Sequence, residues 1–153
     1  MLFRSDNSGI YFDKYGAYDR SSLPDEDLKI LEERNQKAIS YFEDNFTVFG
    51  VYHVDGELTL GENYADLGGL EVIVSLAKTD EDLEKIFENY AVCWCLKSTD
   101  QAVMWQLAYD CHSPVVIRVN AMLSTVDSFY EVYDVKEGDG MYIAPENRIS
   151  RWY

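Results

Sequence analysis

The sequence has no apolar run approaching the roughly 20 residues that a membrane-spanning helix needs. Its N-terminal residues contain no long apolar stretch after the single basic residue Arg4, so we expect no secretory signal peptide. Basic residues are scarce, with 13 Lys and Arg against 28 Asp and Glu, a net charge of −15. Such a negative field repels phosphate backbones and anionic lipid surfaces, which argues against nucleic-acid and membrane partners.

Cysteine is also scarce, and the three present do not form a disulfide pattern. They are Cys93, Cys95 and Cys111. An odd number of cysteines, with no histidine or second pair to complete a zinc knuckle, indicates reduced thiols in a cytoplasmic protein. Neither a phosphate-binding Gly-Lys loop nor a dinucleotide fingerprint occurs, which excludes the common nucleotide-binding classes.

The rest of the composition is that of a folded protein, with 47% hydrophobic and 14% aromatic residues. Apolar spacing and capping residues predict a mainly α fold in one domain over residues 1–153, with a few short strands or turns. The Asp-Gly pair at 55–56 predicts a tight turn, and His112-Ser113-Pro114 predicts a break in the helical pattern. Residues 1–24 and the tail after residue 136 are expected to be irregular. Helices are predicted over residues 25–45, 61–78, 80–96, 100–109 and 125–134.

Two short stretches carry residue types that suit chemistry. Glu62 and Asp66 lie four residues apart, so they share one face of the predicted helix. They suit a buried cation site, but from their spacing alone an acidic first helical turn is the favoured explanation. In the second stretch Asp110 is placed to orient His112, and Arg118 supplies a fixed cation, a set that suits oxyanion stabilisation. A structural histidine and a surface arginine remain the alternative.

The two other features that attract attention have simpler explanations. His53 is the only other histidine, and its place before a turn indicates a solvated side chain. Trp94 and Trp105 suit packing better than ligand stacking.

Together these stretches resemble the neprilysin-type (M13) zinc metallopeptidases. The matching segments are residues 54–70 (VDGELTLGENYADLGGL), 110–120 (DCHSPVVIRVN) and 136–148 (KEGDGMYIAPENR). The resemblance implies the C-terminal portion of a thermolysin-related, neprilysin-like catalytic domain. The isoleucine at 149 replaces a disulfide cysteine of the animal members, which indicates the bacterial oligopeptidase branch and a reducing compartment.

The resemblance also implies roles for four residues. Glu62 corresponds to the third zinc ligand, and Asp66 to a carboxylate that orients a zinc-bound histidine. His112 corresponds to a catalytic residue that stabilises the oxyanion, and Arg118 to the group that binds a substrate carbonyl. Zinc is the family's cofactor and peptides are its substrates.

The family's His-Glu-x-x-His motif, which supplies two zinc ligands and the general base, does not occur in the sequence. Counting back from residues 6–16 (DNSGIYFDKYG) places its second histidine at Phe3, so we expect a chain truncated inside the motif. We therefore predict zinc binding that is weak or absent, and no independent peptidase activity. Two alternatives remain open: a partner chain that carries the motif, or a non-enzymatic peptide-binding module. Apolar surface left exposed would favour a partner or self-association.

Overall fold

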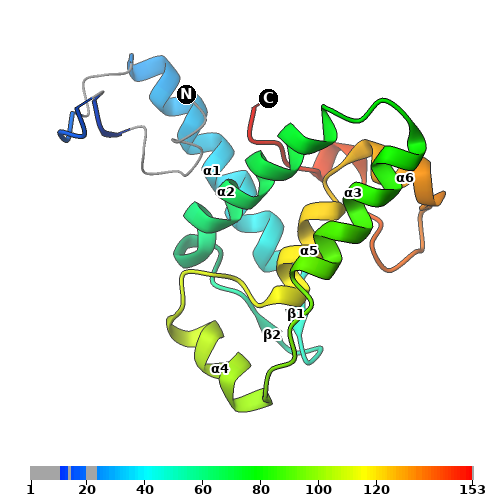
Figure 1. The fold of residues 1–153 in the computed structure, drawn as a ribbon. Coiled ribbons are helices and arrows are strands. Elements are labelled where there is room, and N and C mark those ends of the chain that lie inside the picture. The colour runs from blue at the N-terminus through cyan, green and yellow to red at the C-terminus, as the bar shows by residue number, and fades with distance from the viewer. Residues whose placement is uncertain (1–10, 14, 20–23, 153) are drawn as a thin grey trace.

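The computed structural model describes residues 11–13, 15–19 and 24–152, and these form a mainly helical structure (Figure 1). The prediction of a mainly α fold is therefore confirmed. None of the described helices is both long and apolar enough to cross a membrane. In chain order the elements are α1 (Asp25–Asn45), β1 (Thr47–Val48), β2 (Tyr52–His53), α2 (Gly56–Val74), α3 (Asp80–Cys93), α4 (Asp100–Tyr109), α5 (Val115–Leu123), α6 (Asp127–Tyr133) and the 3₁₀ helix η4 (Pro145–Asn147).

The helices α2, α3 and α4 each begin at a side chain that accepts a hydrogen bond from an otherwise unpaired backbone N–H group. Thr79 accepts from the Asp82 N–H while Asp82 accepts from the Thr79 N–H, a reciprocal capping box at the start of α3. Thr99 caps α4 by accepting from the Ala102 N–H at 3.2 Å. Asp55 caps α2 by accepting from the Leu58 N–H at 2.8 Å. Each cap satisfies a donor that helix geometry leaves unpaired.

The core lies where α1 and α2 cross and where α3, α5 and α6 pack beside them (Figure 1). The helix α4 contributes no buried residue and lies apart from this group, near the small hairpin (Figure 1). The most completely buried large side chains of the core are apolar or aromatic, namely Phe42, Tyr64, Leu67, Leu70, Phe87 and Met122.

At the crossing of α1 and α2 the backbones approach so closely that only glycine fits at position 56. A Cβ added to Gly56 would lie 2.7 Å from the backbone oxygen of Ile39. This contact sets the position of α2, and with it the residues of its polar face.

The structure corrects the predicted fold in two places. The turn at Asp55-Gly56 is the start of α2, because the Asp55 side chain caps a helix that begins five residues earlier than predicted. The hairpin instead joins β1 and β2 through Phe49 and Gly50, both of which have positive φ. The predicted break at His112-Ser113-Pro114 is confirmed, since residues 110–114 are not helical, but the structure then begins a helix that was not predicted, α5, with Pro114 as its N-cap.

The other helices match their predicted positions closely, with ends that differ by at most three residues. The tail after Tyr133 is irregular, as expected, apart from η4. Among residues 11–13 and 15–19 the structure has one isolated antiparallel bridge, between Phe12 and Tyr18. Phe3, where the second histidine of the His-Glu-x-x-His motif was expected to fall, lies outside the described residues.

Candidate functional site

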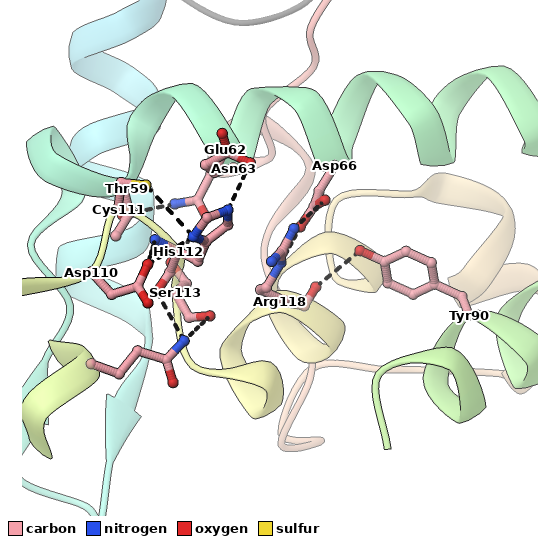
Figure 2. A network of polar contacts seen from close by, with 11 residues as sticks. Thr59, Glu62, Asn63, Asp66, Tyr90, Asp110, Cys111, His112, Ser113 and Arg118 are labelled. Atoms are coloured by element: carbon pink, nitrogen blue, oxygen red, sulfur yellow. Dashed lines mark hydrogen bonds and ion pairs between the residues drawn. The ribbon is translucent and has the colours of Figure 1, made fainter. Parts of the chain in front are cut away.

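The site lies on one face of α2, where four polar residues recur at helical spacing. Thr59, Glu62, Asn63 and Asp66 follow an i, i+3, i+4, i+7 pattern, so their side chains line one stripe. All four face the segment that runs from the end of α4 into α5 (Figure 2). The helix therefore presents a row of polar groups to residues about 50 positions further along the chain.

Two residues of this stripe, Thr59 and Asn63, hold the loop before α5 in place. The Ser113 hydroxyl donates to Asn63 Oδ1 at 2.9 Å, and Asn63 Nδ2 donates to Thr59 Oγ1 at 3.0 Å. From the other side Gln106 Nε2 donates to the backbone oxygens of His112 and Ser113 at 3.1 and 3.3 Å. Because Thr59, Asn63 and Ser113 are buried, these bonds satisfy polar atoms that would otherwise destabilise the fold.

Asp110 fixes the imidazole of His112. Its Oδ1 accepts from the His112 backbone N–H at 2.9 Å and lies 2.7 Å from the ring Nδ1. These two hydrogen bonds from His112, backbone first and ring second, lower the pKa of Asp110. The carboxylate stays ionised and holds the ring in one orientation, as predicted from the sequence.

The other ring nitrogen of His112 points at Glu62. His112 Nε2 lies 3.2 Å from Glu62 Oε2, and both side chains are about two-fifths exposed. A protonated ring donates to both Asp110 and Glu62, whereas a neutral ring keeps one lone pair for another partner. Glu62 is thus a solvent-accessible carboxylate with an oriented imidazole beside it.

One turn along α2, Asp66 binds Arg118 in a bidentate ion pair (Figure 2). Arg118 Nε and Nη2 donate to the two carboxylate oxygens at 2.5 and 2.6 Å, and the side chains are only 10% and 12% exposed. Burial acts to lower the pKa of Arg118, but the hydrogen bonds and charge of Asp66 outweigh it and the pKa is raised. The guanidinium is therefore a permanent cation.

Two aromatic residues complete the surroundings of Arg118. Its guanidinium carbon lies 3.9 Å from the centre of the Trp94 ring, a cation–π contact. The Tyr90 hydroxyl donates to the Arg118 backbone oxygen at 3.3 Å. Trp94, taken from the sequence as a packing residue, thus packs against the charged group of the site.

The structure places all four predicted residues in this one site, in two pairs: Glu62 with His112 and Asp66 with Arg118. Asp66 was expected to orient a zinc-bound histidine, and its partner among the described residues is Arg118. His53 lies elsewhere, exposed, with its ring against the Glu43 backbone oxygen.

Sequence reasoning missed Thr59, Asn63 and Gln106, although the i, i+3, i+4, i+7 spacing on α2 was a usable signal for the first two. It also treated Cys111 only as a free thiol. Together with Glu62 and His112, Cys111 forms a group of metal-binding atoms that all lie within 4.8 Å of one another. Cys93, Cys95 and Cys111 are all exposed free thiols.

The model of peptidase family M13 matches residues 2–149. The chain belongs to peptidase family M13. A neutral endopeptidase of Lactococcus lactis subsp. lactis is 38% identical over 149 residues, which are 96% of this chain and 23% of that protein. Neprilysin-3 of Drosophila melanogaster is 31% identical over 165 residues, covering 96% of this chain and 20% of its own length.

Solved structures agree with these sequence relatives. The crystal structure of PEPO from Lactobacillus rhamnosis matches with a TM-score of 0.86 at 29% identity, covering 95% of this chain and 23% of that one. The Mycobacterium tuberculosis zinc metalloprotease ZMP1, solved with an inhibitor, matches with a TM-score of 0.81 at 28% identity, covering 97% and 25%. The M13 resemblance, including its bacterial branch, is confirmed. The chain spans about a quarter of the length of the relatives it matches.

Proposed function

We propose that this chain forms the carboxylate-ligand and substrate-binding side of an M13-type zinc peptidase site, and that the 153 residues alone do not hydrolyse peptides. The observation that supports this most directly is the pairing along α2 of Glu62 with His112 and of Asp66 with Arg118. The whole relatives, which are about four times longer, suggest the reaction, peptide hydrolysis.

Zinc fits the residues present only in part. Glu62 is accessible, carries a carboxylate oxygen of the kind zinc binds, and lies beside an oriented imidazole. A bound zinc ion would activate water and polarise the scissile carbonyl. The sequence contains only two histidines, of which His53 lies away from the site, so the other family ligands are not among these residues. On its own the chain would therefore hold zinc only weakly.

His112 is suited to stabilise the oxyanion that develops on the substrate carbonyl. Asp110 holds its Nδ1 side, so Nε2 faces Glu62 and is free to donate to a substrate carbonyl that enters beside this carboxylate. A pre-oriented donor of this kind stabilises the transition state without reorganising.

Arg118 is suited to bind a peptide carbonyl next to the reacting one. Two of the five N–H bonds of the Arg118 guanidinium donate to Asp66, which leaves three for a ligand. The ion pair and the contact with Trp94 keep the guanidinium in place. Glu62 and Asp66 are separated by about 6 Å along the helix axis, which is roughly two residues of extended peptide. An extended substrate lying along α2 would thus meet both pairs.

Exposed apolar residues near the site favour a partner. Trp105 and Tyr109 on α4 are 59% and 72% exposed, and Tyr109 immediately precedes Asp110. Two alternatives rest on this surface: a partner chain that supplies the His-Glu-x-x-His motif, or a peptide ligand bound without turnover. Self-association over the same residues is a third outcome. The exposed free thiols favour a reducing, cytoplasmic location.

A graft tests the proposal. Residues 24–153 would replace the aligned part of the Lactococcus lactis relative, which keeps its own upstream sequence. We expect the graft to cleave peptides, and the 153-residue chain alone to be inactive. Glu62→Gln should abolish turnover, whereas Glu57→Gln, which changes an exposed acid five residues earlier on α2, should not.

His112→Gln should lower kcat by about 10²–10³-fold with little change in KM. His53→Gln, which changes the only other histidine, is its control. An active Glu62→Gln graft, or equal effects of the two histidine variants, would contradict the proposal.

A further inference from the structure

The feature that the proposed function leaves unused is the thiol of Cys111. It lies in the loop between α4 and α5, is exposed, and has its Sγ 3.5 Å from His112 Nδ1. On the other side of the ring Nε2 lies 3.2 Å from Glu62 Oε2. One atom each from Glu62, Cys111 and His112 all lie within 4.8 Å of one another.

The His112 and Glu62 donors are about as far apart as two ligands of one metal ion, whereas the Cys111 sulfur lies against the Nδ1 side of the ring. Zinc binds sulfur at about 2.3 Å and nitrogen or oxygen at about 2.0–2.2 Å, so neighbouring donors of a tetrahedral ion lie roughly 3.3–3.6 Å apart. The nitrogen of His112 and the oxygen of Glu62, 3.2 Å apart, lie just below this spacing. Binding at Nε2 therefore requires the exposed Cys111 side chain to rotate about its Cα–Cβ bond, so that its sulfur moves from Nδ1 toward Glu62.

We propose that Glu62, Cys111 and His112 form a site for a thiophilic divalent cation such as Zn²⁺ or Cd²⁺. Glu62 supplies an oxygen, Cys111 a thiolate sulfur and His112 Nε2 a nitrogen. Asp110 orients the ring by binding Nδ1–H, as carboxylates commonly do for metal-bound histidines. On binding, the Cys111 S–H proton passes to the buffer, and the hydrated ion loses all but one of its water ligands as the three protein donors bind.

The site has a modest affinity, because three solvent-accessible donors leave a fourth position to water, and structural zinc sites use four protein ligands. This agrees with the weak zinc binding expected of the chain. Within the ranges that the structure describes, no other group of three such donors comes together. Cys93 and Cys95 are equally exposed but belong to no such group, so they provide an internal comparison.

The inference does not depend on peptidase activity, since it concerns ion binding by the chain alone. It would also place a thiol ligand beside the carboxylate that the proposed peptidase site uses. An ion held this way occupies Glu62 and His112 together, and so competes with their proposed roles toward a substrate.

The experiment is a titration of the reduced 153-residue protein with Co²⁺ under oxygen-free conditions and with a phosphine reductant. Thiolate bonding to cobalt produces a charge-transfer band in the near ultraviolet. We expect one saturating band in the unchanged protein and none in Cys111→Ser. The double variant Cys93→Ser/Cys95→Ser should keep the band at full intensity.

Two further variants test the remaining ligands. Glu62→Gln should weaken Co²⁺ binding by about tenfold or more, and Asp110→Asn by roughly 10–100-fold, as for other carboxylates that orient a metal-bound histidine. Circular dichroism checks that each variant is folded, and Zn²⁺ should displace cobalt and bleach the band.

Three results would overturn the inference: no band in the folded, unchanged protein at millimolar Co²⁺, a band that survives Cys111→Ser, or a band lost only in the double cysteine variant. An inactive graft together with an intact Cys111-dependent band would contradict the proposed function and leave this site standing. An active graft without a band in the isolated chain would contradict the cation site and leave the proposed function standing.

Discussion

The bidentate pair of Asp66 and Arg118 offers the sharpest test of the site's energetics. Asp66→Asn keeps the shape of the side chain and one carbonyl oxygen, but leaves the Arg118 guanidinium without its counter-charge. Only 10% of the Arg118 side chain is exposed, so little water can replace the lost carboxylate. Contact with Trp94 compensates for a small part of the charge.

The size of the effect follows from this burial. Removing one partner of a buried pair destabilises a protein by about 3–5 kcal/mol, because an unpaired charge stays in the interior. Since both side chains retain some exposure, we expect about 3 kcal/mol for Asp66→Asn. Replacing both partners, as in Asp66→Leu with Arg118→Met, removes the unpaired charge and should differ from the unchanged protein by no more than about 1 kcal/mol.

Urea unfolding followed by circular dichroism measures these differences. With a slope of about 2 kcal/mol per molar urea, a loss of 3 kcal/mol lowers the midpoint by about 1.5 M. The control is Glu81→Gln, which breaks the exposed pair of Lys85 and Glu81, whose side chains are 63% and 74% exposed. That change should shift stability by less than about 1 kcal/mol. Equal effects of Asp66→Asn and Glu81→Gln would refute the reasoning.

Two further predictions concern α2 outside the site. Burial raises the pKa of Glu71 above 4.5, although hydrogen bonds from Ser150 and from the Arg151 N–H act against it. The folded protein therefore binds the Glu71 proton more tightly than the unfolded chain does. Protonated Glu71 stabilises the folded state at acidic pH, and this contribution is lost as the pH rises through the folded pKa. Relative to Glu71→Gln, the unchanged protein should lose stability between pH 4.5 and 7 in urea unfolding, and a constant difference would contradict this. Gly56→Ala should destabilise the protein by about 1–3 kcal/mol, because the new Cβ would meet the Ile39 backbone oxygen. Gly69→Ala, whose Cβ would have nothing within 4 Å, should be neutral or stabilising. Similar thermal midpoints for the two variants would count against the close packing of α1 on α2.

The helices that could be predicted are those that begin at a capping residue or proline recognisable in the neighbouring sequence. Pro24 with its following acids, Thr79 with Asp82, and Thr99 each mark a start that the structure keeps. The start of α2 was ambiguous because the same Asp-Gly pair suits a turn or a cap, and the packing of Gly56 on α1 decides for the cap.

The helix α5 could not be predicted because it is stabilised by contacts with residues distant in the sequence. Its sequence is rich in valine and isoleucine, which have low helix propensity, and it follows a proline. Burial of Ile117, Ala121 and Met122 against the rest of the core stabilises it as a helix. Tertiary packing here outweighs propensity, since most helical stability in proteins comes from a buried face.

Glu62, Asp66, His112 and Arg118 could be named from sequence motifs, but their pairing could not. Asp66 and Arg118 are 52 positions apart, and their contact depends on how α5 lies against α2. The same holds for Ser113 and Asn63, 50 positions apart. Spacing within one helix predicts which residues share a face, and only the packed structure determines what that face meets.

The most direct test of the central claim is the zinc content of the grafted enzyme, measured by native mass spectrometry. The proposed role of Glu62 as a ligand predicts one zinc ion per chain in the graft, and loss of that ion or at least about tenfold weaker binding in Glu62→Gln. The Glu57→Gln graft should keep its zinc. Equal zinc occupancy in the Glu62→Gln and Glu57→Gln grafts across a zinc titration would contradict the claim that this chain supplies a ligand of the M13 zinc site.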